Sequence, residues 1–136
     1  MAAHVLARLA RHLEQALGEA NLTLSQYRLL VFLDQRPDAA NRLATQLHVR
    51  PPSLTALVDG MVARSLVDRS ADLDDRRRVK IVITEDGKRL LQLADAVAAQ
   101  RLRHVEALDP DRVDLVDSLG NWHNALDGSL RERLQR

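Results

Sequence analysis

The sequence predicts a mainly helical chain with one small β-hairpin, organised as a single domain over residues 1–136. Three observations lead to this fold class. Leucine, valine and alanine recur at helical spacing over most of the chain. One segment, residues 66–84, changes to the two-residue alternation of β-strands. The chain is also long enough, with 46% hydrophobic residues, to bury one substantial core.

The first two predicted helices occupy the N-terminal third of the chain. Residues 3–18 combine arginines with an apolar stripe at helical spacing, which consists of Val5, Leu6, Leu9, Leu13 and Leu17. Thr23 and Gln26 match a capping box, in which each side chain bonds to the backbone N–H of the other residue. The helix that follows, to about Leu33, is apolar nearly all round, so we expect it at the centre of the fold.

A short helix is predicted over residues 39–47, followed by a tight link at 48–50. Pro51-Pro52 begins another helix, because proline is tolerated in a first turn whose N–H groups lack helical partners. This helix runs to about Arg64. Two strands at residues 66–70 and 79–83, joined by a charged loop, then form the β-hairpin. Two helices joined by a tight turn and followed by a hairpin make a winged helix-turn-helix.

Thr84 caps the long helix that follows the hairpin, and the acidic residues Glu85 and Asp86 in its first turn are favoured by the helix dipole. The segment 109–111, Asp-Pro-Asp, predicts the start of a last helix that runs toward the C-terminus. The predicted order is therefore a winged helix-turn-helix at residues 23–84, flanked by helical segments at 1–20 and 85–136.

Composition excludes several kinds of site. The chain has no cysteine, which removes disulfides and thiolate metal sites and fits a reducing cytoplasm. Its N-terminus lacks an uninterrupted apolar run, so we expect neither a signal peptide nor a membrane span. The net charge is only +1, but residues 42–80 carry eight basic and five acidic side chains. The basic part of the chain therefore coincides with the predicted winged helix-turn-helix, where it favours contact with phosphates.

The helix at residues 52–65 places small or short polar residues opposite its apolar side. These are Pro52, Ser53, Thr55 and Ala56, with Asp59 further along and Arg50 just before the helix. A helix that enters the major groove of DNA needs such a face, because bulky side chains would hold its backbone away from the base edges. The alternative is an ordinary surface helix with a small-residue face.

The hairpin loop gives a sharper indication. Arg76, Arg77 and Arg78 lie at its tip and Lys80 follows, and arginine inserted into a minor groove gains from the negative potential there. The alternative is a solvated charged turn, since nearby acids, including Asp75, partly cancel the charge. Those acids could instead hold the loop in shape while an arginine projects.

Residues 66–90 resemble the wing of the MarR family of bacterial transcription regulators. The matching elements are Leu66-Val67, Arg69, Asp75-Arg76-Arg77, the strand 79–83, and Thr84 with Gly87. Weaker similarity at residues 22–30, 43–44 and 53–55 extends the resemblance over roughly residues 5–135. Two positions depart from the family pattern: Gly60 stands where the family usually has arginine, and Ser65 where it usually has glycine.

The resemblance implies a homodimer whose interface is formed by the flanking segments 1–20 and 85–136. Each recognition helix, residues 51–64, would enter a major groove, and each wing would reach the flanking minor groove with Arg77 as its probing arginine. It also implies that Asp59 pairs with that arginine and, with Asp75, supports the wing. The expected DNA-binding residues are Arg50, Pro52, Ser53, Thr55, Ala56, Arg69, Arg76, Arg77, Arg78 and Lys80.

The predicted function is a cytoplasmic, nucleoid-associated repressor, not an enzyme, that binds a pseudo-palindromic operator. By family resemblance a small aromatic or anionic effector would modulate it, in a pocket lined by Arg8, His12 and Tyr27. We expect no cofactor and no metal ligand set, since no two histidines have a close ligand spacing, although a site assembled across a dimer stays open. The alternative function is a winged-helix protein interaction module that does not bind DNA.

Overall fold

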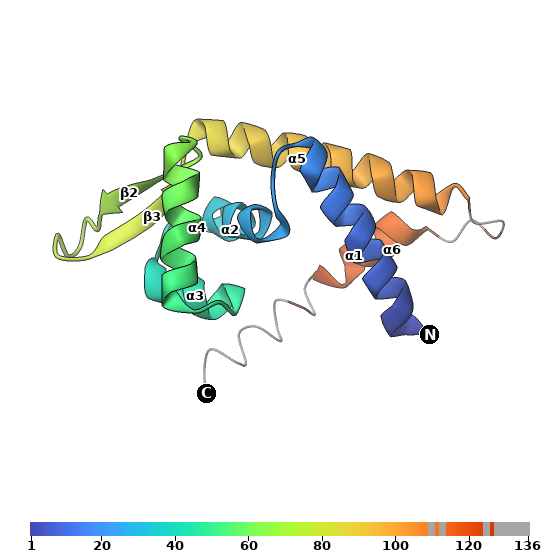
Figure 1. The fold of residues 1–136 in the computed structure, drawn as a ribbon, viewed down its shortest axis with the longest axis horizontal. Coiled ribbons are helices and arrows are strands. Elements are labelled where there is room, and N and C mark those ends of the chain that lie inside the picture. The colour runs from blue at the N-terminus through green and yellow to red at the C-terminus, as the bar shows by residue number, and fades with distance from the viewer. Residues whose placement is uncertain (109–110, 112–113, 124–125, 127–136) are drawn as a thin grey trace.

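The computed structural model describes residues 1–108, 111, 114–123 and 126. Within these residues the fold is mainly helical with one small antiparallel sheet, as predicted (Figure 1). The elements in chain order are α1 (Ala2–Glu19), α2 (Leu24–Gln35), β1 (Asp38–Ala39), α3 (Ala40–Leu47), α4 (Pro51–Ala63), β2 (Val67–Ala71), β3 (Val79–Ile83), α5 (Glu85–Glu106) and α6 (Leu115–Asn121).

The long helix α5 runs along the top of the molecule and joins its two ends (Figure 1). Helices α2, α3 and α4 lie beneath its first half, and the β2–β3 wing projects outward beyond them. Helices α1 and α6 pack against α5 toward the other end. The winged helix-turn-helix and the flanking helical segments therefore occupy different ends of one elongated chain.

Helix α2 is the centre of the core, because it contacts α1, α3, α4, α5 and β3. Its predicted capping box is confirmed: Gln26 N–H donates to Thr23 Oγ1 at 3.2 Å, and Thr23 N–H donates to Gln26 Oε1 at 3.0 Å. The cap fixes where the helix begins and thus which of its residues face inward. The largest fully buried side chains of the core are Leu17, Leu29, Leu30, Leu33, Leu43, Leu54, Met61, Val58 and Val67.

The sheet has one more strand than the sequence indicated. Residues 38 and 39 form β1, which pairs antiparallel with β3 in the register Asp38 to Ile81 and Ala39 to Lys80. The sheet order is β1-β3-β2, so β3 lies in the middle. A strand of two residues has no periodicity of its own, and its pairing depends on a partner more than 40 residues away in the chain. The short helix consequently begins at Ala40 rather than at residue 39.

The start of α5 is fixed against the end of α4. Thr84 Oγ1 accepts from Gly87 N–H at 3.0 Å and donates to the carbonyl of Ser65 at 2.7 Å. A Cβ on Gly87 would lie 2.1 Å from the carbonyl oxygen of Leu66, so glycine alone permits this approach. Ser65 adopts φ 58, in the left-handed region that favours glycine. The departure of Ser65 from the family pattern therefore places a non-glycine residue in a glycine-type conformation.

The C-terminal prediction is tested only in part. Asp109 and Pro110 lie outside the described residues, as does nearly all of the chain beyond His123. Helix α6 begins at Leu115, and its N-cap Asp114 accepts from Asp117 N–H at 3.1 Å. In the described part of the chain this last helix therefore starts four residues after the Asp-Pro-Asp segment ends.

Candidate nucleic-acid interface

The recognition helix candidate α4 has the two faces that its sequence predicts. Leu54, Val58 and Met61 are buried against the lobe. The opposite face is exposed and consists of Pro52, Ser53, Thr55, Ala56 and Asp59, with Arg50 exposed at the N-cap. Thr55 donates its hydroxyl to the carbonyl of Pro51 at 3.1 Å, which holds the side chain close to the helix. The first turn of α4 therefore presents its backbone to the outside with little side-chain cover.

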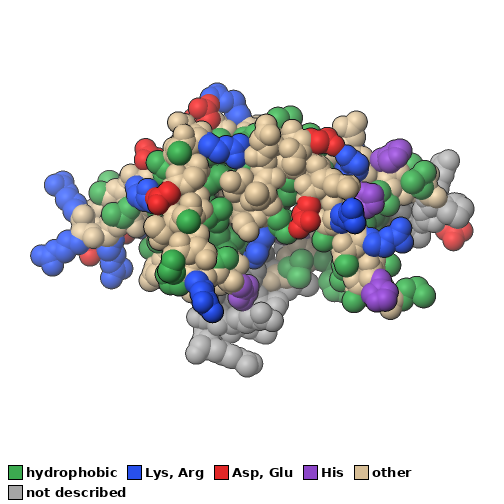
Figure 2. Space-filling view, viewed as in Figure 1, with side chains coloured by type: hydrophobic (Ala, Val, Ile, Leu, Met, Phe, Trp, Pro, Cys, Tyr) green, Lys and Arg blue, Asp and Glu red, His purple; other side chains and the backbone are tan. Residues whose placement is uncertain are grey.

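The wing carries three exposed arginines at its tip: Arg76, Arg77 and Arg78. Figure 2 shows the basic side chains spread at this end of the molecule, well clear of the body. Lys80, on β3, is half-buried nearer the base of the wing. The structure thus places Arg76, Arg77 and Arg78 on one projecting loop, with Lys80 on the adjoining strand, on the same lobe as the exposed face of α4.

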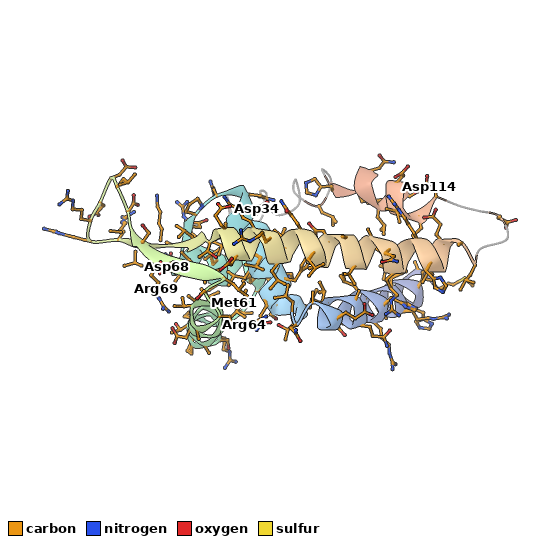
Figure 3. All side chains as sticks on the ribbon, turned by 90° about the horizontal axis from the view of Figure 1, so that it is seen from above. Asp34, Met61, Arg64, Asp68, Arg69 and Asp114 are labelled. Atoms are coloured by element: carbon orange, nitrogen blue, oxygen red, sulfur yellow. The ribbon has the colours of Figure 1, made fainter. Side chains whose placement is uncertain are left out.

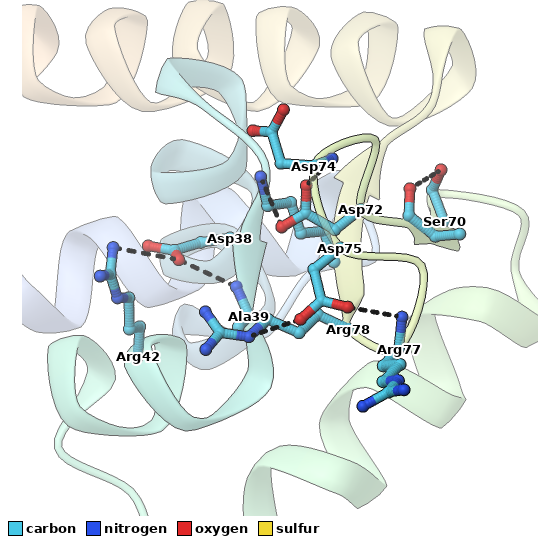
Figure 4. A network of polar contacts seen from close by, with 11 residues as sticks. Asp38, Ala39, Arg42, Ser70, Asp72, Asp74, Asp75, Arg77 and Arg78 are labelled. Carbon is cyan, nitrogen blue, oxygen red and sulfur yellow. Dashed lines mark hydrogen bonds and ion pairs between the residues drawn. The ribbon is translucent and has the colours of Figure 1, made fainter.

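Acidic residues organise the wing loop (Figure 4). Asp75 accepts from Arg77 N–H at 3.0 Å, and its carboxylate lies 3.6 Å from Arg78 Nε. Asp72 accepts from Asp74 N–H at 3.1 Å and lies 3.2 Å from Lys80 Nζ. Hydrogen bonding to the Asp74 backbone and to Lys80 lowers the pKa of Asp72 below its usual value, so its carboxylate is charged at neutral pH. The acids therefore hold the loop in shape, which is the role that the sequence left open for them.

The partner of Asp59 differs from the one that the family resemblance implied. Asp59 is bonded and paired to Arg69 of β2, rather than to Arg77 at the tip. Figure 3 shows Arg69 and Asp68 where β2 passes α4, near Met61 of that helix and its C-cap residue Arg64. The pairing changes because β2 packs directly on α4, whereas Arg77 lies beyond the end of the strand pair. Asp59 thus links the recognition helix candidate to the base of the wing.

The expected effector residues have separate surroundings. Tyr27 donates its hydroxyl to Asp95 of α5 at 2.7 Å, and burial together with this bond raises the pKa of Tyr27 above its ordinary value. Arg8 is exposed on α1. His12 is half-buried, and its Nδ1 atom is buried without a hydrogen-bond partner. Tyr27 therefore has a hydrogen bond that links α2 to α5. The effector pocket remains an expectation from the sequence.

The sequence missed a pocket that borders the wing. It has a volume of about 650 Å³ and lies between β1, the first turn of α3 and the wing. Arg42 lies in its lining, and sequence reasoning gave this residue no function. The sequence feature that could have indicated this pocket was the basic character of residues 42–80. Without β1, however, nothing in the sequence placed Arg42 next to the wing.

Other kinds of site find no support where the structure describes the chain. Over the described ranges, no group of three or more His, Asp or Glu side chains is arranged to hold a metal ion. None of the described helices has the length and apolarity that are needed to cross a membrane. The arrangement that remains is a small-residue helix face beside a cationic loop, which suits a polyanion with grooves.

Comparison with known proteins supports this interpretation. The sequence pattern of the MarR family matches residues 22–79. YhbI of Bacillus subtilis, described as an HTH-type transcriptional regulator, is 35% identical over 60% of this chain and 54% of YhbI. The homoprotocatechuate degradative operon repressor of Escherichia coli is 31% identical over 64% of this chain and 60% of the repressor. The chain therefore matches between half and two thirds of the length of these relatives.

Solved structures extend the similarity over more of the chain. CouR from Rhodococcus jostii bound to p-coumaroyl-CoA superimposes with a TM-score of 0.71 at 24% identity, covering 94% of this chain and 87% of that one. The transcriptional repressor CouR bound to a 23-mer DNA duplex gives a TM-score of 0.69 at 27% identity, covering 86% of this chain and 84% of that one. The chain therefore has a winged helix-turn-helix fold and resembles the MarR family of transcriptional regulators in both sequence and structure.

Proposed function

We propose that this chain is a homodimeric repressor that binds a pseudo-palindromic duplex operator through α4 and the wing. The observation that carries the proposal is that one lobe exposes both a helix face of small residues and an arginine-tipped loop. The first inserts into a major groove and the second into the flanking minor groove. The DNA-bound structure of CouR, at 27% identity, supports this use of the fold.

The opposite end of the molecule supports the homodimer. Large apolar side chains are exposed on α1, after the end of α5, and around α6; these are Val5, Leu6, Leu108, Leu119, Trp122 and Leu126. A cluster of this kind on a single chain marks a protein contact surface. Twofold pairing through this end would present two recognition helices to half-sites about one helical turn apart. The segments 1–20 and 85–136 would then be the dimerisation segments, and the molecule would work at the nucleoid in the cytoplasm.

Modulation by a small aromatic or anionic effector is the second part of the proposal. An effector reduces DNA affinity only by binding better to a dimer whose recognition helices are wrongly spaced. The pocket proposed for it includes Arg8, His12 and Tyr27, and the unpartnered Nδ1 of His12 supports a polar ligand there. In a screen of aromatic carboxylates, an active compound should release DNA from the wild type and lose its effect on His12→Ala.

Selection of bound genomic fragments tests DNA binding. The purified protein is mixed with sheared genomic DNA, bound fragments are sequenced, and affinity for the enriched sequence is measured at several salt concentrations. The logarithm of the binding constant should fall with the logarithm of salt by about 0.9 for each neutralised phosphate. A protein interaction module without DNA binding should enrich no sequence and show no such slope.

The wing arginines provide the matched comparison. Arg77→Gln should weaken operator binding by roughly tenfold, because the substitution removes a charge-assisted hydrogen bond of about 1.5 kcal/mol. Arg89→Gln serves as the control, because Arg89 is an exposed arginine on α5 that pairs with Asp86 away from the wing. Equally weakened binding by both variants would argue against the wing as a specific DNA contact.

A further inference from the structure

A pocket of about 650 Å³ borders the wing beside the first turn of α3. Its lining comes from three elements: Asp38 of β1, Asn41 and Arg42 of α3, and Arg78 and Lys80 of the wing hairpin. Figure 4 labels Asp38, Arg42 and Arg78 among them. A second groove of about 530 Å³ adjoins it along α3 and shares Asn41 and Arg42. Residues far apart in the sequence thus form a hollow, made of the pocket and the adjoining groove, on the side of the sheet where β1 lies, and β2 and α4 lie on the other side.

The exposed charge of this hollow is positive although it contains both signs. The side chains of Asp38 and Asp72 are only 9% and 11% exposed. Those of Arg42 and Arg78 are 66% and 76% exposed. The acids are withdrawn beneath the surface while the guanidinium groups stand outside it, so a molecule that enters the pocket meets cations first.

The arginines of the hollow also retain binding capacity. The carboxylate of Asp38 lies 3.6 Å from Arg36 Nη2 and 4.0 Å from Arg42 Nη1, and Arg78 Nε is 3.6 Å from Asp75. These separations are longer than a hydrogen bond, so the ion pairs leave the N–H donors of the arginines available. Available guanidinium donors suit phosphate oxygens, which they bind in a forked geometry.

We propose that this pocket binds a phosphate group of the DNA strand that runs past the first helix of the helix-turn-helix toward the wing. The inference rests on the proposed function, because it needs α4 in a major groove and the wing in the next minor groove. In that arrangement one sugar–phosphate strand separates the two grooves, and the first helix of the motif, here α3, crosses it. A phosphate held by Arg42 and Arg78 joins α3 to the wing and so fixes the wing on the duplex.

The first test removes the charge of Arg42 and measures the salt dependence of DNA binding. Arg42→Gln should reduce the salt slope of binding by about 0.9 for each phosphate that the side chain neutralises, and weaken binding about tenfold. The reduction should be the same on the selected operator and on an unrelated duplex, because a phosphate contact carries no sequence information. Arg42→Lys should recover part of the affinity, and Arg89→Gln should change neither quantity.

Asn41→Asp separates binding from folding. The substitution keeps the side-chain oxygen that accepts from Arg42 N–H at 2.9 Å, and it places an acid in the first turn of α3, which the helix dipole favours. Thermal stability should therefore hold or rise while DNA affinity falls, because the new charge repels phosphate. Unchanged DNA affinity for both Asn41→Asp and Arg42→Gln would overturn the inference.

The outcomes for this pocket and for the proposed function are distinguishable. A wild type that binds no duplex overturns the proposed function itself. If the wild type binds duplex DNA with a steep salt slope and Arg42→Gln has the same slope, only the pocket assignment is overturned. A free anion is the other source of the same chemistry: if inorganic pyrophosphate raises the thermal stability of the wild type but not of Arg42→Gln, and the salt slopes agree, the pocket binds small anions rather than the DNA strand.

Discussion

The two ends of this molecule leave opposite kinds of surface exposed. The wing end buries its leucines and valines fully or in part, apart from Leu73 and Val79 on the wing itself, and exposes arginines and small residues. The end formed by α1, α6 and the last turns of α5 exposes leucines, a valine and a tryptophan. Under the proposed function, the first end contacts a charged ligand and the second end pairs with another apolar surface. Substitutions at each end, and at the junction between them, test this difference.

The largest effect is expected at the apolar end. Leu6→Glu places a charge in the surface assigned to the dimer and should give a monomer in sedimentation velocity. Operator affinity should then fall about a hundredfold or more, because the two lobes no longer bind as one unit. The control is Leu73→Glu, since Leu73 is fully exposed at the wing and its substitution should leave a dimer. Monomers from both variants, or from neither, would remove the distinction between the ends.

The next largest effect is expected on the free energy of unfolding, where the start of α5 meets the end of α4. Gly87→Ala should lower the free energy of unfolding by about 3 kcal/mol, because its Cβ would overlap the carbonyl of Leu66. Gly60→Ala is the matched change on α4, where a Cβ meets nothing within 4 Å, and it should raise that free energy by about 1 kcal/mol. Both values come from chemical denaturation. A stable Gly87→Ala protein would mean that α5 is not held against the end of α4.

At the wing end, the pair of Asp59 and Arg69 distinguishes support from contact. Arg69→Gln leaves the carboxylate of Asp59 facing DNA phosphates without a partner, so affinity should fall several-fold while stability changes little, as is usual for exposed pairs. Adding Asp59→Asn should restore most of the affinity if Arg69 acts by neutralising Asp59. Failure of the double variant to recover, measured in the same binding assay, would make Arg69 a direct DNA contact.

The smallest effect is expected at Ser65. Because its φ of 58 lies in the region that glycine adopts freely, Ser65→Gly should raise the free energy of unfolding by up to about 1 kcal/mol. Asn21, with φ 54, offers a comparison, since asparagine tolerates this conformation better than serine. Asn21→Gly should therefore gain less than Ser65→Gly in thermal unfolding. A larger gain at Asn21 would show that strain is not concentrated at the exit of α4.

Local patterns predicted the parts of this structure that depend on neighbouring residues. The capping box of Thr23, the two faces of α4 and the cap formed by Thr84 each involve residues within a few positions of one another, and each is confirmed. The structure differs from prediction where distant segments meet. Strand β1 depends on β3 for its pairing, and the choice of Arg69 over Arg77 by Asp59 depends on how β2 packs on α4.

The pocket beside the wing was missed for the same reason. The basic residues that line it were visible in the sequence, but their association depends on β1, which no local pattern indicates. The roles of individual DNA-binding residues stay predictions, since the structure shows their exposure and their intramolecular partners rather than a bound duplex. Sequence reasoning was therefore strongest for helix boundaries and faces, and weakest for contacts that span the sheet.

Helix α5 gives the molecule a mechanical property. It is one unbroken helix of 22 residues, bonded at its start to the wing lobe and packed against α1 toward its other end. Such a rod is ~33 Å long, so a tilt of ~6° at one end displaces the other by ~3.4 Å, about the rise of one base pair. A ligand that shifts the apolar end by this small amount would move α4 out of register with its DNA half-site. The contacts inside the wing lobe would stay unchanged.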